Sequence, residues 1–133
     1  MENQKKIPVL VVEKDQTVVK AIKRALKEKS YNAITVPNEE KSLRFLKEKV
    51  YPLAIVGDAE GTDSAIDMMR KIVKTSPMTS IILISDLPKE QVDEKAEGYG
   101  ILGHISRSIP SKNLTLLIEQ FEKISQSIHF SKV

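Results

Sequence analysis

The chain contains an acidic, basic, acidic tripeptide, Glu13-Lys14-Asp15, directly after the apolar run of residues 8–12. Carboxylates at the exit of a buried strand are typical of sites for hard cations such as Mg²⁺, which prefer oxygen ligands. The lysine places a positive charge where such an ion would bind. The tripeptide therefore predicts either a weakened metal site or a site in which Lys14 takes over part of the ion's role.

Other side chains that can do chemistry follow the later apolar runs, and they are Asp58, Ser85, Asp86, Ser106 and Arg107. In an open parallel sheet, the functional site lies at the carboxyl ends of the strands, near the point where the strand order reverses. We therefore expect these side chains to gather at one edge. The sequence has no cysteine and no glycine-rich phosphate loop after its first apolar run, which argues against thiolate metal sites and nucleotide enzymes.

Five apolar segments can form the strands that position these residues, and they span residues 8–12, 32–36, 53–57, 80–85 and 103–106. The first, third and fourth are continuously apolar, as in parallel strands that are covered on both faces. Helical patterns separate them, which predicts one doubly wound α/β domain with helices on both faces of a parallel sheet. We expect the domain to span residues 1–125, with residues 126–133 as a tail or the start of a linker.

The helix boundaries can also be read from the sequence. Asp15 and Asn38 are placed to cap the first two helices, and the last helix is predicted to start near Ser111. The fourth helix, over residues 88–97, has only Val92 and Ala96 as apolar anchors. We therefore expect it to pack weakly and to be a candidate mobile element.

Composition narrows the classes of function. The 133 residues carry a net charge of +3, and most lysines are accompanied by glutamate, which argues against a nucleic-acid surface. Apolar runs of about five residues are too short to cross a bilayer. Because the first residues also lack a signal-peptide pattern, we expect a cytoplasmic protein with no membrane partner.

With these residues in place, the chain resembles a response-regulator receiver domain of bacterial two-component signalling, from about residue 6 to residue 124. The resemblance implies a flavodoxin-like fold with strand order 2-1-3-4-5. It makes Asp58 the phosphoacceptor, Ser85 the hydroxyl that contacts the phosphoryl group, and Arg107 the counterpart of the family's lysine. His104 takes the aromatic switch position. Mg²⁺ would be held by Glu13, Asp15, Asp58 and the backbone carbonyl of Glu60.

The resemblance also implies partners. They are a histidine kinase or another signalling protein, and a second copy that would dimerise through the fourth helix, strand five and the last helix. The chain itself is then not an enzyme, apart from any phosphotransfer to its own Asp58.

The sequence departs from the family pattern at its chemical positions. Lys14 replaces a carboxylate that contacts the metal, Arg107 replaces a lysine, and Ser108 replaces the proline that follows it. The loop of residues 59–65 is one residue short, and an alternative register would put Gly57 at the acceptor position and leave no acceptor. We favour Asp58, because its spacing from residue 14 is the usual one.

Lys14 can act in two ways. An ammonium about 4 Å from a carboxylate gains roughly 4 kcal/mol at an effective dielectric constant near 20, which predicts an ion pair between Lys14 and Asp58 and an impaired Mg²⁺ site. Alternatively, Lys14 extends into solvent on its flexible stem. In that case Glu13 and Asp15 could still form a weak Mg²⁺ site with Asp58.

Three functions follow from the sequence. The first is a receiver-like domain that signals through protein contacts with an impaired phosphorylation site. The second is a working phosphoreceiver that accepts phosphate on Asp58 from a histidine kinase. The third is a small flavodoxin-like cofactor-binding protein, which the lack of a phosphate-cradling loop disfavours.

Overall fold

The computed structural model describes residues 7–131, and the side chains of residues 7–125. Five parallel strands form one sheet in the order β2-β1-β3-β4-β5, as the fold prediction required. Their bounds are β1 (Ile7–Val12), β2 (Tyr31–Val36), β3 (Leu53–Val56), β4 (Ser80–Ile84) and β5 (Gly103–Ile105). The continuously apolar runs of the sequence form β1, β3 and β4. Four residues of each strand are buried, as expected for parallel strands in the middle of a sheet.

Five helices connect or follow the strands, and they are α1 (Gln16–Glu28), α2 (Glu39–Glu48), α3 (Ala65–Thr75), α4 (Lys89–Lys95) and α5 (Leu114–Ser131). The two predicted caps are confirmed. The Asp15 carboxylate accepts a hydrogen bond from the Thr17 N–H at 2.9 Å, and the Asn38 side-chain oxygen accepts one from the Lys41 N–H at 2.9 Å. Each satisfies a backbone donor that the first turn of the helix leaves free.

The last helix begins three residues later than predicted. Asn113 has a φ of 67°, in the left-handed region, so the chain turns before α5 starts at Leu114. Asparagine adopts this conformation more readily than most residues. At the other end, the backbone of residues 126–131 continues α5, while the last two residues of the expected tail lie outside the described chain.

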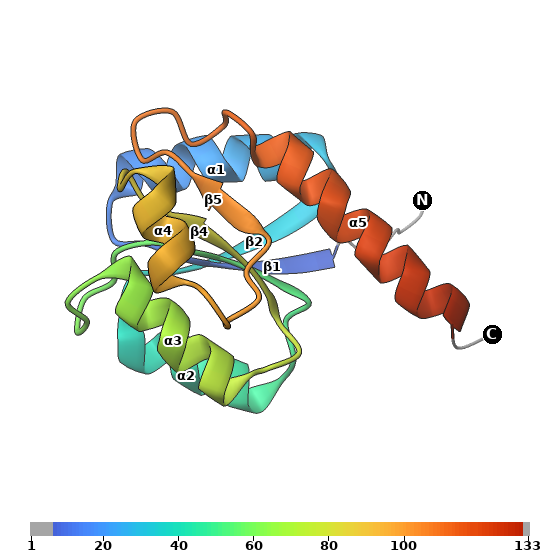
Figure 1. The fold of residues 1–133 in the computed structure, drawn as a ribbon, viewed down its shortest axis with the longest axis horizontal. Coiled ribbons are helices and arrows are strands. Elements are labelled where there is room, and N and C mark those ends of the chain that lie inside the picture. The colour runs from blue at the N-terminus through green and yellow to red at the C-terminus, as the bar shows by residue number, and fades with distance from the viewer. Residues whose placement is uncertain (1–6, 132–133) are drawn as a thin grey trace.

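The sheet separates two apolar cores (Figure 1). One contains residues of α2, α3 and α4, including Leu46, Met69 and Val92, packed against one face of the sheet. The other contains residues of α1 and α5, including Leu26 and Ile118, packed against the opposite face. Thus α1 and α4 lie on opposite sides of the sheet.

The strands end nearly in register, which sets up the site. Val12 pairs with both Val36 and Val56, and the last paired residue of β4, Ile84, aligns with Ile105. The residues that follow these strands therefore lie along one edge of the sheet, at the end away from the labelled termini (Figure 1). Between residues 7 and 131, no helix is long and apolar enough to cross a membrane.

Candidate functional site

A buried carboxylate and a guanidinium form the centre of this edge. Glu13, only 1% exposed, receives both ends of the Arg107 fork: Nη1 donates to Oε1 at 2.8 Å, and Nη2 donates to Oε2 at 2.7 Å. This bidentate geometry is the strongest form of charge-assisted hydrogen bond that side chains make. Hydrogen bonding to Glu13 is the main cause that raises the pKa of Arg107 above its ordinary value.

The main chain completes the shell around Glu13. The Asp58 N–H donates to Oε1 at 3.0 Å, and the Asp15 N–H donates to Oε2 at 2.9 Å. Each carboxylate oxygen therefore accepts one guanidinium N–H and one backbone N–H. Since an ionised carboxylate offers about four lone-pair positions, these bonds use its whole capacity.

Gly57 makes room for this arrangement. A Cβ atom at position 57 would overlap Glu13 Oε1 and press on the Ile84 side chain. The Gly57 N–H donates to the Val12 carbonyl at 2.7 Å, so the backbone cannot easily withdraw. Gly57 is the residue that an alternative register would place at the acceptor position. Its lack of a side chain is explained by packing, because Glu13 occupies the space that a Cβ atom would need.

Asp58 lies at the rim of the same group. Its carboxylate Oδ2 is 3.4 Å from Arg107 Nη1, and its side chain is 43% exposed. One guanidinium thus faces two carboxylates, a buried one that it holds through two hydrogen bonds and an exposed one that it meets as an ion pair.

The predicted ion pair between Lys14 and Asp58 is wrong. Among the described side chains, Lys14 forms no salt bridge, and it is exposed. The physical reason lies in the backbone: the Glu13 N–H donates to Val36 on one side and the Lys14 N–H to Asp58 on the other. The chain is therefore still extended here, and successive side chains of an extended chain point to opposite faces. Arg107, rather than Lys14, provides the cation beside Asp58.

The expected Mg²⁺ ligands do not fit a metal in this arrangement. Glu13 has no free lone pair, and the Asp15 carboxylate caps α1. The Glu60 carbonyl, expected to face the ion, accepts the Glu39 N–H at 2.8 Å, while the Glu60 N–H donates to Pro37. Within the described residues, no group of three or more His, Cys, Asp or Glu side chains could hold a metal ion.

Ser85 and His104 belong to a neighbouring group. The Ser85 hydroxyl accepts the Leu87 N–H at 3.1 Å, and it lines a small hollow together with His104. In the part of the chain with described side chains, no hydrogen bond joins Ser85 to Asp58 or Arg107. The structure thus brings Glu13, Asp58 and Arg107 together but leaves Ser85 and His104 outside that cluster.

Asp86 has a positioning role that the sequence did not reveal. Its Oδ1 accepts the Ser106 hydroxyl at 3.0 Å and the Arg107 N–H at 2.9 Å. The loop after β4 therefore holds the backbone of Arg107 while Glu13 holds its side chain. The only sequence signal was the position of Asp86 after β4, which it shares with any loop residue.

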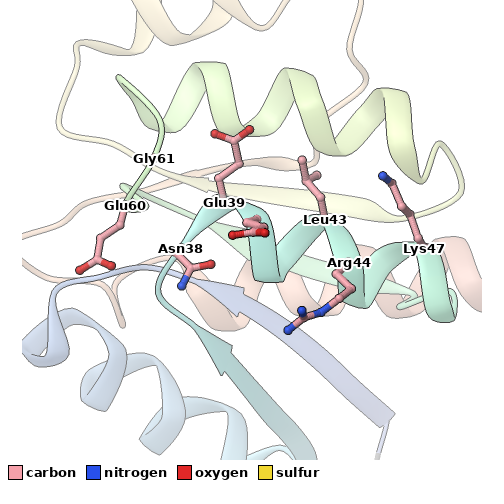
Figure 2. A pocket seen from close by; sticks show the side chains of 8 residues that line it. Asn38, Glu39, Leu43, Arg44, Lys47, Glu60 and Gly61 are labelled. Atoms are coloured by element: carbon pink, nitrogen blue, oxygen red, sulfur yellow. The ribbon is translucent and has the colours of Figure 1, made fainter.

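An open hollow of the described surface lies away from this cluster, along α2 and the loop after β3 (Figure 2). Its lining includes Asn38, Leu43, Lys47, Glu60 and Gly61. Figure 2 shows Leu43 and Lys47 on the upper side of α2, with Glu60 at the left end of the view. The hollow is open, and its charged lining residues, Glu39, Glu40, Arg44, Lys47 and Glu60, include no member of the Glu13, Asp58 and Arg107 cluster.

Comparison with known proteins agrees with this architecture. The family model of the response regulator receiver domain matches residues 9–119. A receiver domain of a putative LuxO repressor protein from Vibrio parahaemolyticus is similar in structure, with a TM-score of 0.81 and 16% identity over 97% of this chain and 99% of that chain.

Two further solved structures show the same fold. A response regulator from Thermotoga maritima has a TM-score of 0.74 and 21% identity, over 88% of this chain and 98% of that chain. A CheY-like receiver domain protein from Methanospirillum hungatei has a TM-score of 0.76 and 16% identity, over 92% and 99% of the two chains. No curated protein matches the chain in sequence. Because the family model covers most of its length, the chain belongs to the response regulator receiver domain family.

Proposed function

We propose that this receiver domain signals through protein contacts in a conformation held by the Glu13–Arg107 pair, without metal-dependent phosphorylation of Asp58. The observation that supports the proposal is the bidentate pair itself. Together with two backbone N–H groups, Arg107 occupies the lone pairs of the Glu13 carboxylate that a metal ion would need. Phosphoryl transfer to a carboxylate requires neutralisation of the phosphoryl oxygens, which Mg²⁺ supplies in this chemistry.

Arg107 takes over one part of the ion's role and not the rest. Its single positive charge neutralises Glu13 and faces Asp58 at 3.4 Å. A guanidinium is an excellent partner for a fixed carboxylate, but it cannot bridge an acceptor and a phosphoryl oxygen as a divalent ion with six ligands does. The Glu13–Arg107 pair is therefore neutral in itself, and Asp58 leaves the cluster with one negative charge before any modification.

The partners of such a domain are signalling proteins. Receiver domains act on other proteins rather than on small substrates, so the output is expected through a surface of the fold. A histidine kinase, and a dimer through α4, β5 and α5, remain the family's expectations for this chain. The proposal needs only that the partner recognises the conformation that the ion pair holds.

The test is phosphorylation with a small donor. Purified protein is incubated with acetyl phosphate and Mg²⁺, and the intact mass is followed, with Asp58→Asn as the control. We expect no stoichiometric modification. Complete phosphorylation that is lost in Asp58→Asn would overturn the proposal and establish the working phosphoreceiver, which the 43% exposure of the Asp58 side chain favours.

A second experiment asks what disables the metal site. The variant Arg107→Lys keeps the positive charge but removes the fork that fills Glu13, and it leaves residue 14, which points away from the cluster, unchanged. Calorimetric titration should then detect Mg²⁺ binding that the parent lacks. If the parent binds Mg²⁺ equally well, the ion pair does not block the metal and the proposed function is overturned.

A further inference from the structure

Two helices of the fold carry charge stripes of opposite sign. The outer face of α1 presents a basic stripe of four exposed side chains, Lys20, Lys23, Arg24 and Lys27. The outer face of α4 and the turn after it presents an acidic stripe of four exposed side chains, Glu90, Asp93, Glu94 and Glu97. Side chains that are three, four and seven positions apart share one face of a helix, so each stripe is continuous.

The two stripes have the same spacing and the same relation to the core. A shift of 70 positions superposes every basic residue on an acidic one, from Lys20 on Glu90 to Lys27 on Glu97. The same shift superposes the buried Ile22 on Val92, which both face the core. The basic stripe and the acidic stripe are therefore complementary in register as well as in charge.

Among the described side chains, the basic stripe has no ion-pair partner, and only one carboxylate of the acidic stripe has one. No described acidic side chain lies within salt-bridge distance of the basic stripe. In the acidic stripe, Asp93 pairs with Lys89 at 2.7 Å, and the described salt bridges include none of the other three carboxylates. Exposed charges cost little free energy, because water solvates them. When a surface of opposite charge approaches, they attract it and favour one orientation of binding.

The stripes cannot meet inside one molecule. The buried side of α1 packs on one face of the sheet, with Ile22 and Leu26 in that core. The buried side of α4 packs on the opposite face, with Val92 and Ala96 in the other core. Each stripe points away from the sheet. A basic stripe and an acidic stripe can therefore come into contact only when they belong to two different copies of the chain.

We propose that copies of this chain associate head to tail, with the basic stripe on α1 of one copy against the acidic stripe on α4 of the next. Such an interface uses two different surfaces, so an assembly of any length keeps one free basic stripe at one end and one free acidic stripe at the other, and it grows as an open chain unless its geometry closes a ring. This assembly is distinct from a symmetric dimer through α4, β5 and α5, and it requires no chemistry at Asp58.

The contacts are charged and exposed, which predicts their behaviour. Exposed ion pairs are weak and are screened by salt over a Debye length of about 10 Å at 0.1 M ionic strength. We therefore expect an average mass in light scattering that rises with protein concentration at low salt. At about 0.5 M NaCl the mass should return to that of a monomer.

Charge reversal tests the pairing directly. One variant carries Lys23→Glu with Arg24→Glu on α1, and the other carries Glu90→Lys with Glu94→Lys on α4. Each alone should remain monomeric at low salt, because two reversed charges out of four leave the altered stripe with no net charge to attract its partner. An equimolar mixture should associate again in pairs, because the native acidic stripe on α4 of the first variant fits the native basic stripe on α1 of the second. Circular dichroism checks that both variants fold. We expect them to fold, because all four substituted side chains are exposed.

A matched control changes the net charge by the same amount elsewhere. Lys41→Glu with Lys112→Glu reverses two exposed lysines that belong to neither stripe, and it should associate like the parent. The proposal is overturned if the parent stays monomeric at low salt, or if α1 reversal leaves association unchanged, as in a symmetric dimer. It is also overturned if mixing the two reversed variants fails to restore association. Binding of the basic stripe to a polyanion such as heparin would not rescue the proposal in that case, because it would indicate a different partner.

Discussion

At the scale of single residues, the site is an ion pair in a nearly dry setting. Glu13 is buried and Arg107 has a side chain that is 22% exposed. A buried pair adds little net stability compared with apolar residues of the same shape, but removal of one partner is costly because it leaves an uncompensated charge. The two residues should therefore behave as one unit.

Truncation of the cation tests this unit. Arg107→Ala should lower the free energy of unfolding by about 3 kcal/mol, because the Glu13 carboxylate would keep only its two backbone donors in a buried place. Urea unfolding measures the loss. Arg107→Lys keeps the charge without the fork and should lose less.

A double-mutant cycle with Glu13→Gln separates the pair from its parts. The double variant Glu13→Gln with Arg107→Ala should be more stable than the sum of the single losses predicts, by about 1–3 kcal/mol, as for residues in contact. Strict additivity would show that Glu13 and Arg107 stabilise the fold independently.

The glycine beneath Glu13 gives a second prediction at this scale. Gly57→Ala should cost about 3 kcal/mol, at the upper end of the overpacking range, because the new methyl group overlaps a carboxylate fixed by four hydrogen bonds. Gly103→Ala is the matched control. Its Cβ would lie 2.8 Å from the end of the flexible Leu117 side chain, which can turn aside, so we expect about 1 kcal/mol. Equal losses would show that the Glu13 carboxylate is free to move.

At the scale of elements, one hydrogen bond joins the edge strand β2 to the last helix. The Tyr31 hydroxyl donates to Glu122 Oε2 at 2.7 Å. Burial, followed by this hydrogen bond and the charge of Glu122, raises the pKa of Tyr31 far above its ordinary value. The folded chain therefore holds this proton more tightly than the unfolded chain.

The sign of the pH dependence follows. A raised pKa in the folded state gives a contribution that is complete below the unfolded value of about 10 and is lost as the pH rises beyond it. Tyr31→Phe should make the alkaline loss of stability shallower and remove the last phenol to ionise in an absorbance titration. Tyr99→Phe, which removes a phenol without a hydrogen bond among the described side chains, should leave that last step in place.

The elements themselves could be read from the sequence because their signals are local. Apolar runs, caps such as Asp15 and the spacing of helix faces lie within a few residues of the structure they specify. The partner of a carboxylate is not local: Glu13 meets Arg107 rather than the adjacent Lys14 because the backbone direction decides which side chain points inward. The hydrogen bond from the Glu39 N–H at the start of α2 to the Glu60 carbonyl in the loop after β3 was not predicted for the same reason.

At the scale of the whole molecule, one sheet joins two cores into a single folding unit. Leu53 and Leu83 are both fully buried on neighbouring strands, but they face opposite cores. Leu53→Ala and Leu83→Ala should each cost about 2–5 kcal/mol. Because both cores depend on the same strands, each variant should still unfold in one transition seen at the same urea concentration by fluorescence of tyrosine and by circular dichroism. Separate transitions would show that the two cores unfold independently.

The Glu13–Arg107 pair has a mechanical consequence. The two residues are 94 positions apart and follow β1 and β5, between which the sheet places β3 and β4. In parallel strands, tension on the first residues draws β1 toward its amino end, and tension on the last residues, once α5 detaches, draws β5 toward its carboxyl end. The two forces slide β1 and β5 past each other in opposite directions, and the Glu13–Arg107 pair, which joins the ends of these strands, resists that sliding. A molecule stretched by its two ends would thus meet resistance from an ion pair between the ends of two strands that are not neighbours in the sheet, in addition to the hydrogen bonds that join neighbouring strands.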